Sequence, residues 1–247
     1  MRAIVTYHSI DPSGSVISVA PDAFRAHVAW LAASDVRVTT VGALLALPAD
    51  ASAVALTFDD AVANFATEAW PALRAAGLTA TLFVVTDYVG RANDWGTRGH
   101  RIPRLDLLSW EALGRLAAEG VLIEAHSRTH PDLRAVDPAR LADEMEGSAE
   151  RLARELGQRP EGFAYPYGAH DERVVNQARG AWRWACTTEL GALRGGDDPH
   201  RLPRLDAYYL RTPDGWADWD TPAFRRRLRL RALARRARAA ILERGAR

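Results

Sequence analysis

The chain has 247 residues, of which 48% are hydrophobic and 26% charged, and this composition suits one compact domain and excludes wholesale disorder. The single cysteine, Cys186, excludes a disulfide framework and any metal cluster built from several cysteines. All 32 basic residues are arginine, which excludes chemistry that needs a lysine amine, such as Schiff-base formation. No apolar run is long enough for a membrane span or for a signal-peptide core, so we expect a cytoplasmic protein.

Apolar, β-branched runs alternate with helical patterns along most of the chain. Strands are expected at 3–7, 54–58, 80–85, 121–125, 162–165 and 184–187. Helices are expected at 22–33, 64–76, 110–119, 138–156 and 171–179. This alternation predicts parallel strands joined by helical crossovers, in a barrel or an open α/β sheet. The segment 90–108 lacks periodicity and is long for a simple connection, so we expect a functional loop there.

The charge is unevenly distributed along the chain. Residues 224–247 contain ten arginines and one glutamate, a local charge of +9, and since the net charge is +1 the other 223 residues carry −8. The apolar spacing predicts a basic amphipathic helix over 222–247, after a domain that spans 1–221. This helix can pack its apolar stripe on the domain or lie on an anionic membrane surface. Nucleic-acid binding is not expected, because the rest of the chain is acidic and no aromatic residues lie between the arginines.

Two carboxylates directly follow the expected strand 54–58, where an α/β scaffold presents its site. Asp59 and Asp60 repel each other unless a cation or a shared proton lies nearby. On extended or turning backbone the two side chains diverge, so one can face a metal ion while the other faces a substrate. The alternative is an acidic first turn of a helix.

Two histidines, His126 and His130, follow the expected strand 121–125. On helical backbone a spacing of four places both imidazoles on one face, where they can bind one metal ion. Together with one aspartate they form a two-histidine, one-carboxylate set that leaves positions open for water and substrate. Such a set accepts Zn²⁺, Co²⁺, Ni²⁺ or Mn²⁺.

Three further residues are less specific signals. Tyr167 lies in a Pro-Tyr-Gly turn that can direct a backbone N–H into a cleft, or can simply be a tight turn. His8 ends the first expected strand, where a structural role is the simpler interpretation. Trp95, in the segment 90–108, is either a platform for a sugar ring or an anchor for the loop.

Taken together, TFDD at 57–60, HSRTH at 126–130 and FAYPYG at 163–168 resemble the polysaccharide deacetylases, the NodB-like proteins of carbohydrate esterase family four. The resemblance covers about residues 1–210 and implies a distorted (β/α) barrel that removes N-acetyl groups from amino sugars. It implies that Asp60, His126 and His130 bind a divalent metal, usually zinc, and that Asp59 is the general base. It also implies that the backbone N–H of Tyr167 helps to hold the oxyanion.

The chain departs from the common pattern of that family at two places. Ala164 stands where many members have an arginine that orients the base, and the segment 202–206 lacks the late histidine that protonates the leaving amine. The pattern is nearer the branch of the poly-β-1,6-N-acetylglucosamine deacetylases, whose early Tyr-His motif is matched by His8. We therefore predict that His8 supplies the acid and that Arg204 replaces the missing arginine. The other interpretation is a weakened enzyme.

Without an export signal, we expect an intracellular substrate such as a lipid-linked amino-sugar intermediate of polysaccharide or glycoconjugate assembly. The basic helix 222–247 would then contact the inner membrane face, and Trp216 and Trp219 either face a glycan or membrane or pin that helix. Two other functions stay open. One is another C–N hydrolase on the same scaffold, acting on a cyclic amide or imide, and the other is a non-catalytic protein that binds a glycan or a membrane.

Overall fold

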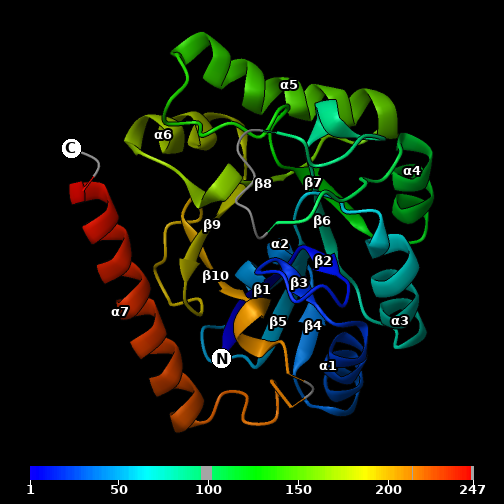
Figure 1. Ribbon diagram of the computed structural model, residues 1–247, viewed down its shortest axis with the longest axis vertical. Coiled ribbons are helices and arrows are strands. Elements are labelled where there is room, and N and C mark those ends of the chain that lie inside the picture. Colours follow the sequence, from blue (N-terminus) through cyan, green and yellow to red (C-terminus); the bar gives the residue numbers. More distant parts are fainter. Residues whose placement is uncertain (96–101, 213, 246–247) are drawn as a thin grey trace.

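The computed structural model describes residues 1–95, 102–212 and 214–245, with the side chains of 236 and 238–245 left aside. Within these residues seven parallel strands close into a barrel in the order β1-β10-β9-β8-β7-β6-β5, and β5 pairs back with β1 (Figure 1). This confirms the expected (β/α) barrel. The strands are β1 (Arg2–Tyr7), β5 (Ala53–Phe58), β6 (Thr81–Val84), β7 (Leu122–Ala125), β8 (Gly162–Ala164), β9 (Trp184–Leu190) and β10 (Leu202–Asp206).

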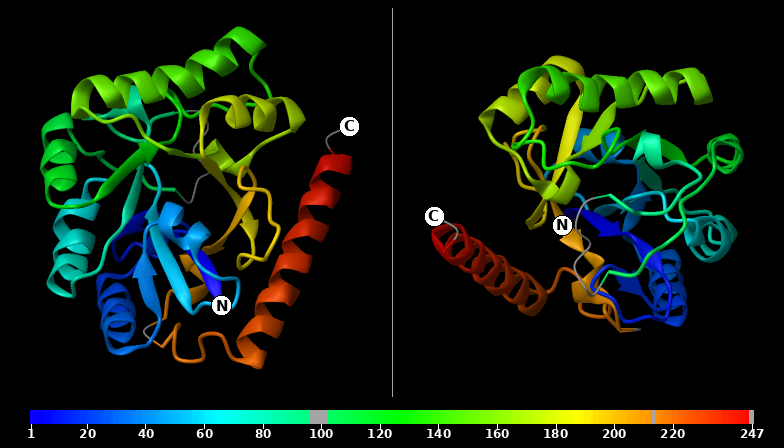
Figure 2. Two further views of the ribbon diagram at one scale, coloured as in Figure 1. Left: turned by 180° about the vertical axis from the view of Figure 1, so that it is seen from behind. Right: turned by 45° about the horizontal axis from the view of Figure 1, so that its top comes forward.

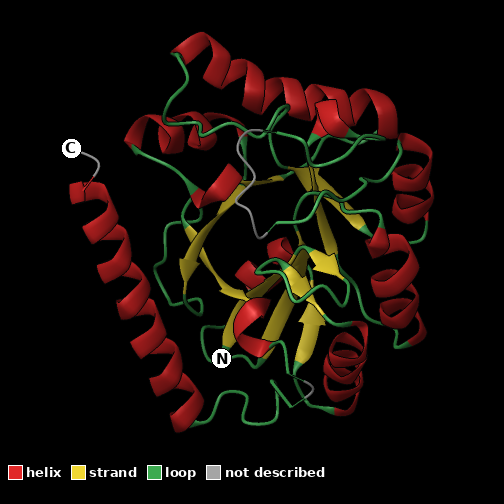
Figure 3. Ribbon diagram, viewed as in Figure 1, coloured by secondary structure: helices red, strands yellow, loops and turns green. Residues whose placement is uncertain are grey.

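Helices surround the strands, as Figure 3 shows by colour. They are α1 (Pro21–Ala33), α2 (Val41–Ala46), α3 (Trp70–Ala75), α4 (Trp110–Ala118), α5 (Pro138–Leu156), α6 (Glu172–Ala181) and α7 (Pro222–Gly245). The short helix α2 differs from the others, because its buried Val41 and Leu44 pack with the side chains inside the barrel. No helix among the described residues is both long and apolar enough to cross a membrane.

Short elements complete the fold. The strand β4 (Arg37–Thr39) pairs with the first half of β5, and β6 pairs with the second half of β5 on the same edge. A separate parallel pair is formed by β2 (Ser9–Ile10) and β3 (Ser18–Val19). Single helical turns are η1 (Phe65–Ala69), η2 (Thr86–Tyr88), η3 (Pro166–Gly168) and η4 (Ala207–Leu210).

Side chains alternate strictly along the barrel strands, as a period of two requires. On β5, Val54, Leu56 and Phe58 belong to the large core between the strands and the helices, whereas Ala53 and Ala55 belong to the cluster inside the barrel. The inner cluster also contains small residues of other strands, Ala164 and Cys186 among them. The next inward position after β5 is Asp59, and the next after β1 is His8. The register of the strands therefore directs both residues into the carboxyl-terminal mouth of the barrel.

The six expected strands are all present, and the structure adds β4, α2 and β10, whose short patterns were not predicted as regular elements. The expected helix 64–76 is interrupted, because it begins as the π-helical turn η1 and continues as α3. The backbone N–H of Trp70 donates to the Phe65 carbonyl, the pattern of a π-helix. Pro71 has no N–H and cannot donate the backbone hydrogen bond that an α-helix would have at that position. Part of the expected functional loop 90–108 lies outside the described residues.

The helix α7 begins at Pro222, and the division into domains 1–221 and 222–247 stays a prediction. Trp216 and Trp219 stack on each other with ring centroids 4.5 Å apart, and Trp219 packs against Phe224 at the start of α7. Both tryptophans are buried, at 1% and 8% exposure. They therefore hold the start of α7 on the barrel, and the alternative that they face a glycan or membrane was wrong.

Candidate metal centre and active site

The predicted site residues meet at the carboxyl-terminal end of the barrel strands. A pocket of about 130 Å³ opens there, and its walls include Asp59, Asp60, His126, His130 and His8. These side chains come from the segments that follow β1, β5 and β7. Trp95 and Tyr167 also contribute to its wall. Parallel barrels present polar groups at this end because the loops that leave the strands converge on it.

Three of these residues form a compact set of donor atoms. The Nε2 atoms of His126 and His130 lie 3.5 Å and 3.7 Å from Oδ1 of Asp60. Three candidate ligand atoms, one from each residue, lie within 4.8 Å of one another, and all three residues are buried. Ligands about 2.0–2.2 Å from a tetrahedral cation are separated by roughly 3.3 Å, so little movement is needed to bind one.

Electrostatics at Asp60 and His130 suit the binding of a divalent cation. Burial raises the pKa of Asp60, against the opposing charges of His8 and His126. Burial, together with the neighbouring His126, lowers the pKa of His130 well below its ordinary value, which keeps a lone pair available for a metal. Oδ1 of Asp60 and Nδ1 of His130 are buried without a hydrogen-bond partner among the described residues. The donor set therefore fits a divalent metal.

Left-handed backbone produces this convergence. Asp60 has a φ of 72°, Ser127 of 65° and His130 of 58°, in a region that L-residues rarely adopt. The turn after β5 sends Asp59 and Asp60 in different directions, and it does not form the acidic first turn of a helix. His126 and His130 converge through a turn after β7 rather than on one face of a helix. The reason is that the Ser127 hydroxyl accepts the His130 N–H and closes the turn.

Glu144 on α5 supports the same turn, and the sequence analysis missed it. Its carboxylate accepts the backbone N–H groups of Arg128 and Thr129 at 3.0 Å and 2.8 Å. It also accepts the Thr129 hydroxyl. Glu144 is 2% exposed. No local pattern in α5 signals this role, because the contact joins residues 15 positions apart.

Asp59 is held by Arg204 in a buried bidentate ion pair. Nη1 and Nη2 of Arg204 donate to Oδ1 and Oδ2 of Asp59, each at 2.7 Å. Arg204 also donates to the Thr6 hydroxyl at 3.0 Å and to the Thr187 carbonyl at 2.8 Å, which leaves its guanidinium with one orientation. Both partners are at most 2% exposed. Thr6 and Thr187 were not predicted from the sequence.

Two effects of opposite sign act on Asp59. Burial is the largest single effect and would raise the pKa of the Asp59 carboxyl, but the charges of Arg204, His126 and His8 and the hydrogen bonds from Arg204 together outweigh it. The pKa of Asp59 is therefore lowered, so the carboxylate stays ionised beside the donor set. Arg204 lies on β10, whereas Ala164 lies on β8 and belongs to the cluster inside the barrel.

His8, the predicted acid, and His200, the histidine just before β10, lie at opposite ends of the barrel. Nε2 of His8 lies 3.8 Å from Oδ2 of Asp59, and the His8 side chain is 24% exposed in the pocket. His200 precedes β10 at the amino-terminal end, where its ring bonds to the Trp182 carbonyl at 2.9 Å. Only His8 is within reach of a substrate that contacts Asp59.

Tyr167 and Trp95 flank His130. The Tyr167 ring lies 4.5 Å from the His130 ring and is 54% exposed, whereas Trp95 lies 4.8 Å from it and is 7% exposed. Tyr167 has a φ of 60°, and Gly168 must be glycine, because a Cβ there would lie 2.2 Å from the Thr188 hydroxyl. All three ring residues also border a second groove of about 830 Å³. The small pocket and this groove therefore share one wall.

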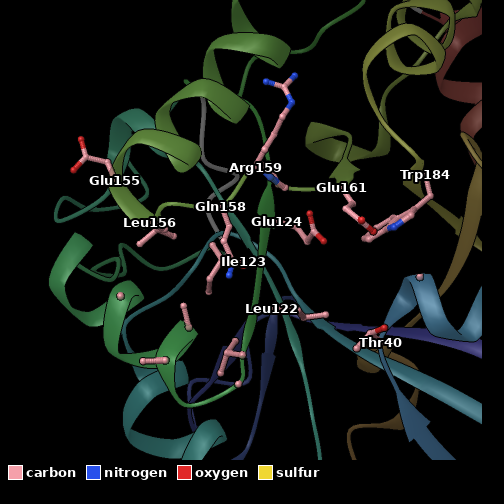
Figure 4. Close-up of a pocket in the computed structure, with 17 residues that line it drawn as sticks. Thr40, Leu122, Ile123, Glu124, Glu155, Leu156, Gln158, Arg159, Glu161 and Trp184 are labelled. Carbon is pink, nitrogen blue, oxygen red and sulfur yellow. The ribbon is translucent and has the colours of Figure 1, made fainter.

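A larger pocket, of about 860 Å³, lies at the amino-terminal ends of the strands (Figure 4). Glu124 reaches toward Glu161 and Trp184 there, and its carboxylate accepts the Gly162 N–H at 2.8 Å. Burial raises the pKa of Glu124 to about 8. This pocket shares no residue with the donor set, so we place the chemistry in the smaller pocket.

The sequence profile named polysaccharide deacetylase matches residues 46–181, more than half of the chain. The match includes Asp59, Asp60, His126 and His130. His8 lies before it and Arg204 lies after it.

Individual proteins agree with this match. The YxkH protein of Bacillus subtilis, provisionally named a polysaccharide deacetylase, is 27% identical over 82% of this chain and 70% of its own length. The poly-beta-1,6-N-acetyl-D-glucosamine N-deacetylase of Staphylococcus epidermidis is 22% identical over 76% of this chain and 67% of its own length. The solved deacetylase PplD of Streptococcus pyogenes has the same fold, with a TM-score of 0.75 and 23% identity over 89% of this chain and 98% of PplD.

Proposed function

The chain belongs to the polysaccharide deacetylase family, and we propose that it removes the acetyl group of an N-acetylated amino sugar with the help of a divalent metal. One observation carries the proposal. A buried carboxylate that is paired with an arginine lies beside a buried donor set of one aspartate and two histidines. A purely structural ion pair would not need the unsatisfied Asp60 and His130 atoms next to it.

The metal would be held by Asp60, His126 and His130. Zinc is the expected ion, and Co²⁺, Ni²⁺ or Mn²⁺ also suit this donor set. When bound, such a cation supplies Lewis-acid chemistry, because it lowers the pKa of a water molecule and polarises the acetamide carbonyl. The His126 ring is oriented for this task by its Nδ1 contact with the Ala164 carbonyl at 2.7 Å, which leaves Nε2 toward Asp60.

Asp59 would act as the general base. Its carboxylate accepts a proton from water as the water oxygen attacks the carbonyl carbon of the acetamide. Arg204 keeps Asp59 ionised and fixes the plane of the carboxylate. Oδ1 of Asp59 accepts from both Arg204 and the Thr6 hydroxyl, whereas Oδ2 accepts from Arg204 alone among the described residues and so retains a lone pair for the incoming proton. The Tyr167 N–H, in its left-handed turn at the pocket wall, would donate to the oxygen on which negative charge develops.

His8 would protonate the leaving nitrogen. Hydrolysis adds water across the C–N bond, releases acetate and returns a free amine, so the amine needs a proton as the bond breaks. His8 lies at the pocket wall next to Asp59, and its partial exposure gives its ring access to protons from solvent. Among the described residues, the late histidine used in other members has no equivalent near the donor set, because His200 is at the other end of the barrel.

A carbohydrate chain suits the surface next to the small pocket. The pocket of about 130 Å³ accommodates a group of acetamide size, whereas the adjoining groove of about 830 Å³ can hold flanking sugar residues. Tyr167 is exposed enough to contact a sugar ring, and aromatic faces are suited to such contacts. Trp95 is largely covered, so we assign it mainly to the support of His130, with its pocket edge left for the substrate.

We further propose a lipid-linked amino-sugar intermediate as substrate, used by a cytoplasmic enzyme at the inner membrane face. The support is the basic helix α7, which brings arginines and exposed Leu230 and Leu233 to the surface. Flotation with anionic vesicles, with and without residues 222–247, tests this contact. Equal flotation of both forms would contradict it.

Acetate release from N-acetylated glucosamine oligomers is the test of the proposed reaction. Purified protein is stripped of metal, reconstituted with Zn²⁺ and assayed beside the variant Asp59→Asn, with metal content measured for both. We expect acetate release by the zinc form and metal retention with loss of turnover in the variant. Turnover of cyclic amides or imides without acetate release would identify a different C–N hydrolase, and no hydrolysis of either class would indicate a binding protein.

A further inference from the structure

The arginines of α7 fall into rows with different surroundings. One row faces the barrel: Arg227 forms two hydrogen bonds of 2.8 Å with Asp218, Arg231 reaches the Tyr209 carbonyl at 3.3 Å, and Arg235 lies 3.7 Å from Asp206. Positions four residues apart share a helix face, so this row holds the helix on the barrel. The helix runs along the outside of the barrel beside β9 (Figure 2).

A second row borders a groove between α7 and the segment that follows β9. The groove has a volume of about 580 Å³, within the range of roughly 300–1,000 Å³ in which small-molecule sites occur. Its walls are apolar at Leu190, Leu193 and Leu228. Leu233, which is 62% exposed, continues this apolar wall toward solvent.

Cationic groups surround the groove with few anions to balance them. Arg194 and Arg229 are exposed, and neither guanidinium forms an ion pair with a carboxylate in the described part of the chain, although the Asp197 carboxylate accepts the backbone N–H of Arg194 at 2.7 Å. Arg225 is neutralised by Asp220. Asp50 is the one acidic residue in the described wall. The groove therefore has an excess of positive charge.

Arg2 adds a buried positive charge to the wall of the groove. It lines the groove and is 7% exposed, and its Nη1 donates to the carbonyls of Leu44 and Leu47 at 3.2 Å and 2.9 Å. Its Nε–H is buried without a partner among the described residues. The Arg2 guanidinium therefore contributes positive charge beside the groove, while its Nη1 donors stay directed to the carbonyls at the end of α2.

We propose that this groove binds the phosphate of an anionic phospholipid, with Arg194 and Arg229 at the phosphate and the leucines against the lipid chains. The inference rests on the membrane contact proposed above and assigns it to particular residues. Free phosphate fits less well, because it would leave the apolar wall and the exposed Leu230 and Leu233 in water.

The test measures partition of the full chain onto vesicles of phosphatidylcholine with and without phosphatidylglycerol. Arg229→Ala and Arg194→Ala are each expected to weaken binding to the anionic vesicles about fivefold, the effect of roughly one surface charge. Arg226→Ala is the matched control, since it removes the same charge from an exposed position of α7 outside the groove. It is expected to change binding less than about twofold.

Four results would overturn the proposal: equal losses in all three variants, no loss in Arg194→Ala, absence of wild-type binding, or binding of inorganic phosphate alone at these arginines. Equal losses would still leave a general membrane contact of α7 in place. Acetate release from soluble oligomers is measured on the same preparations. It can fail while vesicle binding succeeds, so the two proposals are tested separately.

Discussion

Both ends of the barrel contain buried carboxyl groups, but these groups have different partners at the two ends. At the carboxyl-terminal end Asp59 has a bidentate arginine partner, and Asp60 lies against two histidines. At the amino-terminal end Glu124 accepts a backbone N–H, and burial leaves its pKa high. The larger pocket lies at the amino-terminal end, at about 860 Å³ against about 130 Å³. The carboxylates that are paired with basic side chains therefore identify the end of the barrel where we place the chemistry, whereas the volume of the pocket does not.

Backbone strain separates the two ends as well. Of the six described non-glycine residues with positive φ, five lie around the small pocket: Asp60, Ala61, Ser127, His130 and Tyr167. Left-handed backbone costs an L-residue roughly 1–2 kcal/mol. The closed barrel supplies the rigidity that keeps these conformations populated, and strain of this kind collects at functional sites.

The largest expected effect is the loss of the metal. Asp60→Ala combined with His126→Ala should reduce bound metal from about one equivalent to none. Acetate release should fall at least about 1,000-fold, because several kcal/mol of transition-state stabilisation are removed. Mass spectrometry of metal content and an acetate assay check this. Glu124→Gln, at the other end, should retain both, and a double variant with full metal content would refute the assigned ligands.

Next in size is the Asp59–Arg204 pair. Arg204→Met should destabilise the protein by about 3–5 kcal/mol in denaturant unfolding, since it leaves a buried carboxylate unpaired. Adding Asp59→Asn should recover part of that loss without restoring activity. The exposed pair Arg183–Glu161 at the amino-terminal end is the control, and Arg183→Ala should cost at most about 1 kcal/mol. Equal costs would show that the buried pair has no special role.

The third-largest expected effect is the loss of the proposed general acid, His8. His8→Gln should lower kcat by about 100-fold with metal content unchanged, because general acid catalysis typically contributes 10²–10⁴-fold. His200→Gln is the matched change at the amino-terminal end, and we expect it to alter kcat less than about twofold. Steady-state kinetics with one soluble oligomer checks both. Full turnover by His8→Gln would rule out this histidine as the acid.

The smallest effect concerns Glu124 and appears in stability alone. Its pKa is about 8 in the folded protein against 4.5 ordinarily, so between these values the folded state binds the extra proton. Stability should therefore fall as pH rises through this range, by about 1–3 kcal/mol. In Glu124→Gln the amide oxygen can still accept the Gly162 N–H, and this slope should disappear. Denaturant unfolding at pH values near 5 and 8 decides, and an unchanged slope would contradict the assignment.

Several features followed from the sequence alone, because they depend on local pattern. The alternation of strands and helices predicted a barrel or an open α/β sheet, and the resemblance to the polysaccharide deacetylases implied the barrel. Polar residues directly after expected strands singled out Asp59, Asp60, His126 and His130. Period-two alternation on β1 and β5 directs His8 and Asp59 to the inside of the barrel, and both residues follow the carboxyl-terminal ends of their strands. The position of each of these residues can be predicted without knowledge of the packing, because it depends only on one strand and the turn that follows it.

Only the tertiary structure decided which distant groups meet. Arg204 reaches Asp59 across 145 positions of sequence, and Glu144 supports the turn that brings His130 to Asp60. Strand order alone puts β10 beside β1 and so selects Arg204 for a role that a residue at Ala164 could have filled. His8 and His200 each lie close to a barrel strand in the sequence, yet closure of the barrel places them at opposite ends. The physical reason is that partner choice depends on strand register and burial, which arise only when the sheet closes.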